Sequence, residues 1–473
     1  MSSLTTDLLR GAAGLTVQSK GLEVAGNNLN NVNTAGYSRQ IVQISSGAML
    51  QGTQGPEAME VSVSAVTQAR SSFLDQQVTF EKSLTGSMSA LNDIYQQVQS
   101  ALGQNVDTSG QSSSISTDST ISGGITGAMS SFFNAFQSLA ANPADSTTKS
   151  TVISQAQTLA LQINTADQNL AQVQSSTNSQ ISTDVSSVNG LLKDISNLNL
   201  QISKFEAGSP GSALDLRDQR QQDLEQLAGY MNFTTANGTG GNLQINVQDA
   251  SGNPVNLVNG KDLGAPVTFN GTAFQAGSPT ATLGLTSGSL PSELSASTTY
   301  TQSVRDDLSK LASQLITSVN AAYNPGGTGT NFFAAGTGAA GSLINVSSGI
   351  SASSLTAGSV GGAGANDIAT AVASVASNTF STSNGDQIDG TLSGFFTQTV
   401  GRVGNAASSA ASNLQDQQLT EQLAESQRDQ VSGVSMDEET TNLLKYQRAF
   451  QASARYVNTI DQMLNTVINT MGV

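Results

Sequence analysis

The sequence predicts a mainly α-helical protein with an inserted β-rich domain, in which helices from the two ends of the chain pair as a coiled coil. Three observations support this fold class. Apolar residues recur with a heptad period at both ends, helical spacing dominates residues 125–203, and residues 230–286 change to alternation interrupted by turns. We therefore expect a long helical bundle and an outer β domain between two paired terminal helices.

The N-terminal heptad predicts a helix over residues 4–32. Leucines recur every seven residues and a valine follows at an interleaved position: Leu8, Leu15, Leu22, Leu29 and Val32. A stripe this narrow favours burial against a partner helix. Glycines interrupt the segment, and each costs up to about 1 kcal/mol relative to alanine. The helix is therefore expected to be marginal alone and to fold when it docks against neighbouring subunits.

The C-terminal heptad supplies a candidate partner helix. Its apolar positions follow alternating steps of three and four residues: Leu443, Tyr446, Phe450, Val457, Ile460, Leu464 and Val467. Ser435, followed three residues later by Glu438, predicts a capping box at the start of this helix. The two helices could form an ordinary pair within one chain. Their position at the chain ends, which are usually poorly ordered, favours packing between subunits.

The domain organisation follows from changes in residue pattern along the chain. Residues 1–103 read as a helix, a β-hairpin and a second helix of an axial core, with alternating strands at 39–44 and 59–66. The remaining predicted segments are a linker at 104–124, a helical bundle domain at 125–229, an inserted β-rich outer domain at 230–290, a returning helix at 291–323, a Gly/Ala/Ser-rich insertion at 324–394 that could be poorly ordered, and C-terminal helices of the axial core at 395–473.

Acidic residues at three places could be mistaken for catalytic or metal sites. The run from Asp249 to Asn253 lacks the spacing of a calcium loop and predicts a hairpin turn. Residues 437–439 predict an acidic helix start. Asp215 and Asp218 lie near Arg217 and Arg220 at helical spacing, so we expect local ion pairs. No catalytic, cofactor or metal residues are predicted.

Composition excludes several classes of function. The 473 residues carry 18 Lys plus Arg against 34 Asp plus Glu, a net charge of -16, which disfavours binding to nucleic acid. Cys, His and Trp are absent, which removes thiol and imidazole chemistry. Charged residues make up 11%, a fraction typical of structural surface proteins rather than cytosolic enzymes. Neither a membrane span nor a cleaved signal peptide is expected.

The run from Gly26 to Gln40, GNNLNNVNTAGYSRQ, resembles the N-terminal signature of bacterial flagellar rod, hook and hook-associated proteins. The stretch from Ser432 to Phe450 is similar to the C-terminal motif of the same proteins. With the helical interior and the LDLRDQR run at 214–220, the chain most resembles the family of flagellar hook-associated protein 1. Ala35 departs from the proline that this family often has before Gly36.

The resemblance implies a structural role with no enzymatic activity and no cofactor. It implies an adaptor at the hook-filament junction that is needed for filament assembly and motility. The resemblance also implies that the chain is exported unfolded by type III export. On the extracellular flagellum it would assemble into a ring of identical subunits. Hook protein, the third hook-associated protein and an export chaperone at the C-terminal region are the implied partners. A hook or distal rod protein, or a surface adhesin whose activity lies in residues 230–390, remain alternatives.

Candidate packing residues come from the two heptads and from the signature run. Beyond the apolar heptad positions given above, the signature run contributes Asn27, Asn28, Asn31, Asn33, Gly36, Tyr37 and Arg39. The asparagines also fit helix termination, because their side chains compete for backbone hydrogen bonds. Tyr37 and Arg39 also fit a surface aromatic and a solvated charge. The sequence therefore leaves both a local and an intersubunit role open for this run.

Overall fold

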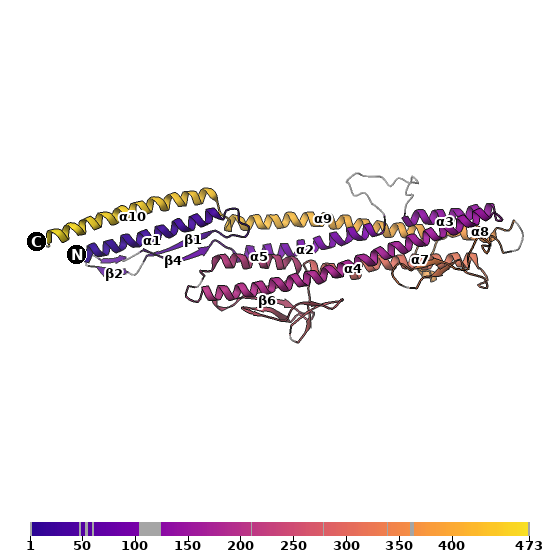
Figure 1. The fold of residues 1–473 in the computed structure, drawn as a ribbon, viewed down its shortest axis with the longest axis horizontal. Coiled ribbons are helices and arrows are strands. Elements are labelled where there is room, and N and C mark those ends of the chain that lie inside the picture. The colour runs from indigo at the N-terminus through magenta and orange to yellow at the C-terminus, as the bar shows by residue number, and fades with distance from the viewer. Residues whose placement is uncertain are drawn as a thin grey trace. The chain divides into compact units, whose positions relative to one another are not determined.

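The computed structural model describes residues 2–46, 49–52, 55–58, 61–103, 124–209, 211–277, 279–337, 339–359 and 364–471 (Figure 1). The chain forms two compact units. Unit 1 comprises Met1–Gly86, Val185–Gly288 and Gln417–Val473, and unit 2 comprises Ser87–Asp184 and Ser289–Asp416. The predicted linker 104–124 lies outside the described residues except for Gly124, which begins a helix. Helices α2 (Ser72–Ala101), α4 (Ser146–Phe205) and α9 (Leu392–Ser432) contribute residues to both units.

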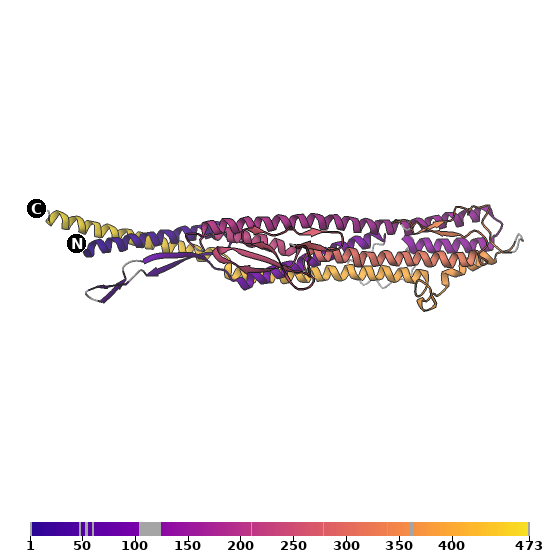
Figure 2. The ribbon, with the colours of Figure 1, turned by 90° about the horizontal axis from the view of Figure 1, so that it is seen from below.

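Unit 1 contains the two terminal helices, α1 (Ser2–Asn30) and α10 (Met436–Met471). They lie side by side and run antiparallel, as Figures 1 and 2 show. The prediction that the chain ends pair as helices is therefore confirmed. The predicted cap of α10 is also present, because the backbone N–H of Glu438 donates to Ser435 Oγ at 3.4 Å.

A long hairpin follows α1 in unit 1. Strand β1 (Gln40–Ser46) pairs antiparallel with β4 (Val61–Gln68), and β2 (Met49–Gly52) pairs with β3 (Gly55–Ala58). The β1–β4 pair contains a bulge between Gln43 and Ile44. The predicted alternating strands pair as β1 and β4, and both of these strands contact α1.

The β-rich part of unit 1 consists of two small sheets beside α5 (Leu214–Tyr230). Strands β5 (Thr234–Asn237), β6 (Leu243–Gln248), β7 (Pro254–Asn259) and β8 (Asp262–Leu263) form an antiparallel meander. Strands β9 (Thr268–Phe269), β10 (Phe274–Ala276) and β11 (Ala281–Thr282) form the second sheet. The predicted turn at Asp249 is present, because its Oδ1 accepts the N–H of Ser251 and of Asn253, each at 2.8 Å.

The meander docks on the part of α4 that belongs to unit 1. Alternate residues of β6, Leu243, Ile245 and Val247, are buried. Asn199 on α4 is fully buried, and its Nδ2 donates to the carbonyls of Leu243 and Gly260. This one side chain satisfies backbone groups at the ends of two strands, which a buried sheet end requires.

Unit 2 is a helical bundle around an aromatic core. Its helices are α3 (Gly124–Ala141), α6 (Ser289–Ser295), α7 (Gln302–Tyr323) and α8 (Asp367–Ser374), with the π-helix η2 (Ala296–Thr301) and its parts of α2, α4 and α9. Phe132 of α3 is fully buried, with ring centroids 5.2 Å from Phe136 and 5.4 Å from Phe333. Such edge and tilted contacts add to the stabilisation from buried apolar area.

The Gly/Ala/Ser-rich segment 324–394 differs from the sequence expectation. Where described, it contains strands β12 (Phe333–Ala335) and β13 (Ile344–Val346), helix α8 and the 3-10 helices η3 (Val375–Ser377) and η4 (Thr382–Asn384). Its few apolar side chains enter the core of unit 2: Phe332, Phe333, Ile344, Leu355, Ile368, Val372 and Ile388. The irregular spacing of these residues hides their burial, because they are spread over two short strands, one short helix and the loops between them rather than along one periodic helix face.

Candidate functional site

Helices α1 and α10 approach most closely at glycines of α1. A Cβ atom added at Gly11 would lie 2.6 Å from Val457 Cγ2, and one added at Gly21 would lie 2.6 Å from the ring of Tyr446. Distances this short are not tolerated by real side chains. The glycines that weaken α1 as an isolated helix therefore allow α10 to contact its backbone.

The heptad leucines of α1 lie at the margin of this interface. Apart from Asn28, the buried residues of α1 are small or β-branched: Gly11, Ala13, Val17, Gly21, Val24 and Ala25. Leu8, Leu15, Leu22 and Leu29 are half-buried. On α10, Ile460 is buried, Phe450 is exposed, and the others are half-buried: Leu443, Tyr446, Val457, Leu464 and Val467. Much of the predicted apolar seam therefore stays accessible within one chain.

Asn28 is the centre of the signature run. It is 1% exposed. Its Nδ2 donates to the carbonyl of Gln40 at 2.9 Å and to Glu439 Oε2 at 3.1 Å. Its Oδ1 accepts the hydroxyl of Tyr37 and the N–H of Gln40, both at 2.9 Å. One amide thus uses its donors and acceptors to join the end of α1, the start of β1 and the first turn of α10.

Arg39 fastens the same region to the end of α9 and the start of α10. Its Nε lies 2.8 Å from Glu439 Oε1, and its Nη1 lies 2.9 Å from Glu438 Oε2. The backbone N–H of Arg39 donates to the carbonyl of Ser432, the last residue of α9, at 2.8 Å. The acidic residues that favour the N-terminus of α10 therefore also hold the signature run.

Asp215 and Asp218 tie α5 to the signature run. Asp218 Oδ2 accepts the N–H of Ser38 at 3.1 Å, and Asp218 Oδ1 lies 3.2 Å from Arg70 Nη1. Gln40 Nε2 donates to Asp215 Oδ1 at 3.1 Å. Burial raises the pKa of Asp218 to about 6, although Ser38 and Arg70 oppose the shift.

The expectation of local ion pairs in the LDLRDQR run is therefore wrong. Arg217 forms a bidentate pair with Glu206 at 2.8 Å, and Arg220 donates to Asn199 and to the carbonyl of Gly241. The four charged side chains of this run point away from one another, because each is directed to a different neighbouring element. Helical spacing alone did not reveal these partners.

Tyr37 lies against a small cavity beside the cluster. The cavity has a volume of about 410 Å³, and Asn27, Asn31, Tyr37 and Gln40 are among its lining residues. Burial, followed by the charges of nearby carboxylates, raises the pKa of Tyr37 to about 12. The phenol therefore stays protonated at neutral pH and continues to donate to Asn28.

The remaining signature residues end the helix. Asn31 Nδ2 donates to the carbonyl of Asn27 at 3.0 Å, and that carbonyl also accepts the backbone N–H of Asn31 at 3.1 Å. Gly36 has a φ of +75° and a Cβ there would clash with Gln222, so glycine is required. Val32 is half-buried and Asn33 is exposed. The local role predicted for the asparagines is thus present, and Asn28 adds a long-range one.

The sequence does not reveal that Asn28 differs from its neighbours. Five asparagines occur in one short run, and only the tertiary structure shows that Asn28 alone is buried against Glu439, 411 residues away. A weak signal exists: in a chain with 11% charged residues, the acidic start of α10 and the single arginine of the signature run stand out.

The described residues contain no group of three or more carboxylates, histidines or cysteines placed to hold a metal ion. None of the described helices combines the length and the apolar character needed to cross a membrane. What the site offers chemically is therefore a set of hydrogen bonds and ion pairs that fix the terminal helices to α5 and α9.

Three family models match the chain. "Flagella basal body rod protein" matches residues 8–37, and "Flagellar basal body rod FlgEFG protein C-terminal" matches residues 425–471. "Flagellar hook-associated protein FlgK helical domain" matches residues 113–333. The first two models coincide with the paired helices α1 and α10 and their signature cluster. They define the class: the chain is an axial structural protein of the bacterial flagellum.

Similar proteins narrow the class further. Flagellar hook-associated protein 1 of Bacillus subtilis strain 168 is 27% identical over 533 aligned positions, which cover 100% of this chain and 99% of that protein. The corresponding proteins of Salmonella typhimurium and Escherichia coli K12 are 29% and 27% identical over 56% of this chain, and the alignments span 42% and 43% of those proteins. Over its full length the chain is therefore similar to flagellar hook-associated protein 1.

Among solved structures, the flagellar hook junction protein FlgK from Burkholderia pseudomallei is similar, with a TM-score of 0.45 and 24% sequence identity. The match covers 55% of this chain and 46% of that one.

Proposed function

We propose that this chain is a structural adaptor that joins the flagellar hook to the filament and is needed for filament assembly. The observation that carries the proposal is the accessible apolar surface of the terminal helix pair. Phe450, Tyr456 and Met463 of α10 are 37%, 46% and 50% exposed. Exposed apolar side chains repeated along one helix pair indicate an interaction surface, and neighbouring axial subunits would bury them.

The arrangement supports a ring of identical subunits. A closed ring needs contacts between different patches of neighbouring copies. The antiparallel pair α1–α10 presents two different sets of side chains, the half-buried leucines of α1 and the exposed apolar residues of α10. The intersubunit packing residues named from the sequence are part of this proposal.

The finer partners and the route of export are also proposals. Hook protein would contact the ring on one side and the third hook-associated protein on the other. An export chaperone would bind the C-terminal region before assembly, because the apolar stripe of α10 would otherwise be free to aggregate. The chain would reach the extracellular flagellum without a cleaved signal peptide and would have no catalytic role.

Replacement of Met463 by Asp in the chromosomal copy tests the proposal. The side chain is exposed, so the variant should fold, while a carboxylate should prevent apolar contact between subunits. We expect electron micrographs of cells with completed hooks and no filaments, and flagellin in the medium. Leu161→Asp is the matched control, because Leu161 is 64% exposed but lies in unit 2.

Other outcomes would contradict the proposal. Missing hooks would place the chain in the rod or hook, and normal flagella in Met463→Asp cells would show that α10 packs against nothing. Loss of filaments in both Met463→Asp and Leu161→Asp cells would show that the terminal helices are no more important for assembly than unit 2. Deletion of residues 436–471 provides the corresponding null phenotype for comparison.

A further inference from the structure

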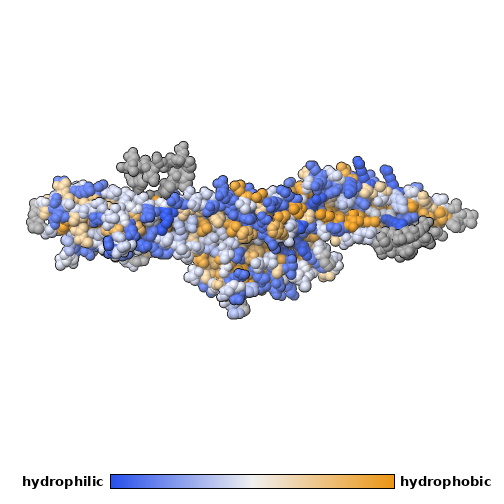
Figure 3. Space-filling view, turned by 180° about the vertical axis from the view of Figure 1, so that it is seen from behind, coloured by the Kyte–Doolittle hydropathy of each residue, from blue (hydrophilic) through white to orange (hydrophobic). Residues whose placement is uncertain are grey.

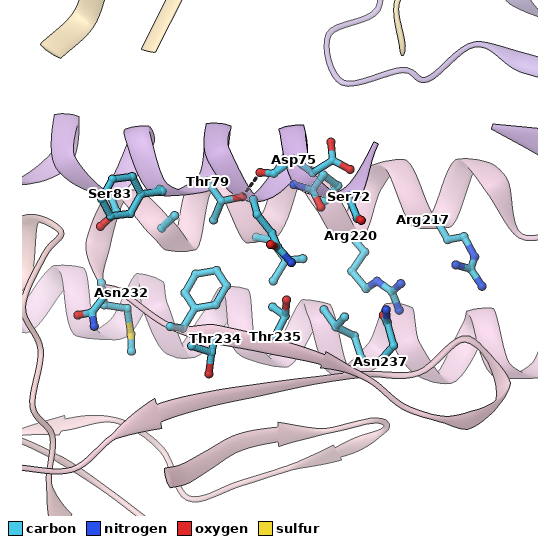
Figure 4. A pocket seen from close by; sticks show the side chains of 18 of the residues that line it. Ser72, Asp75, Thr79, Ser83, Arg217, Arg220, Asn232, Thr234, Thr235 and Asn237 are labelled. Carbon is cyan, nitrogen blue, oxygen red and sulfur yellow. Dashed lines mark hydrogen bonds between the residues drawn. The ribbon is translucent and has the colours of Figure 1, made fainter. Parts of the chain in front are cut away.

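A second, larger pocket lies in unit 1, away from the helix pair. Its volume is about 680 Å³, within the range of small-molecule sites. The first half of α2, helix α5 and strand β5 form its walls (Figure 4). Arg217, Arg220 and Asn237 lie toward one end, and Ser83 and Asn232 lie toward the other. The pocket is lined by side chains of one unit, so its shape does not depend on the second unit.

Arg220 is the unusual residue of this pocket. It is only 7% exposed, yet no carboxylate of the described residues forms an ion pair with it. Its Nη1 donates to Asn199 Oδ1 at 2.6 Å and to the carbonyl of Gly241 at 2.8 Å. Both acceptors are neutral. A buried charge without a counter-ion is costly, so such groups are normally paired.

The neighbouring arginines do not share this deficit. Arg217 pairs with Glu206, and Arg70 pairs with Asp75 and Asp218. The effect on Arg220 is visible in its pKa, which burial, followed by the charges of Arg217 and Arg70, lowers to about 10. An anion bound at this end of the pocket would offset the energetic cost of the buried Arg220 charge. It would also weaken the repulsion between Arg220 and the two neighbouring arginines.

The rest of the lining indicates what the anion would carry. Phe80 is 58% exposed although it lies on the pocket wall, and Leu224 and Met231 are buried along the same pocket. Hydroxyl and amide side chains of Ser72, Thr79 and Asn237 also line the pocket, as does the carboxylate of Asp75, which pairs with Arg70. A carboxylate suits a guanidinium in geometry and charge, and an apolar body would cover Phe80.

We infer that this pocket binds a small organic carboxylate, with its carboxylate group at Arg220 and its apolar body against Phe80. The inference is independent of the adaptor function, because none of the lining residues belongs to α1 or α10. It adds a ligand site to a protein whose other contacts are with polypeptides.

Calorimetric titration and thermal unfolding of the full-length chain with benzoate test the inference. We expect saturable binding and a rise in Tm, because a ligand that binds the folded state stabilises it. Benzamide, the neutral analogue, should bind at least roughly tenfold more weakly, because it lacks the charge that pairs with Arg220. Sulfate should also bind more weakly, because it has no apolar body.

Three variants separate binding from folding. Gln76 lines the pocket and is exposed, so Gln76→Glu should fold, place a carboxylate in the pocket and abolish benzoate binding. Gln77→Glu, the same change one residue further along α2 and outside the lining, should leave binding unchanged. Phe80→Ala should weaken benzoate but not acetate. Arg220→Gln should lose benzoate binding. If Arg220→Gln does not fold, Gln76→Glu alone tests whether benzoate binds in this pocket.

The inference would be overturned by the absence of saturable benzoate binding to the unmodified chain. Equal affinity for benzamide would show that charge does not matter, and equal affinity for sulfate would show that the apolar body does not. Unchanged binding to Gln76→Glu would place the ligand elsewhere. A normal hook-filament junction in Gln76→Glu cells is expected, so this site and the adaptor function can fail separately.

Discussion

The two units handle their apolar side chains in opposite ways. In unit 2, Phe132, Phe136 and Phe332 are fully buried in one core. In unit 1, Phe73 and Phe205 are 70% and 68% exposed. Leu161 is the single exposed large hydrophobic residue of unit 2 in the described part of the chain, and unit 1 contains all the others.

This difference indicates which unit buries its apolar residues within a single chain. Unit 2 covers its own apolar residues, as a domain that is stable alone must. Unit 1 leaves apolar surface on the helix pair and on α2 and α9, part of which is orange in Figure 3. Exposed apolar surface of this kind marks interaction sites. Unit 1 is therefore built for assembly, and unit 2 for its own stability.

The largest predicted effect concerns the core of unit 2. Phe132→Ala should destabilise that unit by about 3–5 kcal/mol, because it removes a buried ring and leaves a cavity. Chemical denaturation followed by circular dichroism measures the loss. Phe73→Ala in unit 1 is the matched control and should change stability by less than about 0.5 kcal/mol. Equal losses in the two variants would contradict the contrast between the units.

The next effect concerns a buried carboxyl in unit 2. Burial, followed by the charges of the nearby Asp184 and Asp93, raises the pKa of Glu293 from its ordinary value of 4.5 to about 8. Between these two pH values the folded state keeps a proton on Glu293 that the unfolded state has lost. This contribution to stability is fully present below about pH 4.5 and is lost as the pH rises through about 8. The loss at pH 9 should be on the order of 3 kcal/mol.

Glu293→Gln should remove that loss, because glutamine cannot ionise. Thermal unfolding at pH 5, 7 and 9 checks this, and the variant should be the more stable protein at pH 9. Asp145→Asn is the control: hydrogen bonds to Thr148 and Thr147 lower the pKa of Asp145, so it stays ionised over this range and its removal should leave the slope unchanged. An unchanged slope in Glu293→Gln would refute the assignment.

A smaller effect concerns the helix pair of unit 1. Gly21→Ala should destabilise α1–α10 packing by about 1–3 kcal/mol, because the new Cβ would overlap the ring of Tyr446. Gly26→Ala, where a Cβ meets nothing within 4 Å, should be neutral or stabilising by up to about 1 kcal/mol. Amide exchange over residues 4–32 reports the result, and equal protection in the two variants would contradict close packing.

The smallest effect on stability should come from the exposed surface of α10. Leu444 is 49% exposed, so Leu444→Ser should change the free energy of unfolding by less than about 0.5 kcal/mol. The same change should reduce self-association, measured by sedimentation velocity at high protein concentration. A large loss of stability would show that this side chain is needed within the chain.

Local sequence patterns predicted the elements well. The helix start at Ser435 and the turn at Asp249 follow from capping and turn residues, whose hydrogen bonds reach only a few positions. The alternation of Leu243, Ile245 and Val247 predicted a half-buried strand, which is β6. The prediction of a flagellar hook-associated protein, made from short motifs, is confirmed by the family models.

Partners distant in the chain were not predictable in the same way. The heptad pointed to leucines, but α1 approaches α10 most closely at Gly11 and Gly21, and the leucines of α1 are half-buried or exposed. The reason is that heptad spacing fixes which face of a helix is apolar, and the closeness of the partner decides which side chains fit there. The burial of segment 324–394 was hidden for a related reason, since its core residues are spread over short strands, a short helix and loops with no common period.

The sequence by itself determined the helices, the strands, the paired ends and the family, because each depends on local periodicity or on short motifs. Tertiary structure alone decided that Asn28 meets Glu439, that Asp218 meets Ser38 and Arg70, and that no carboxylate of the described residues pairs with Arg220. Those contacts join elements far apart in the chain. They depend on how whole helices pack, which no local pattern encodes.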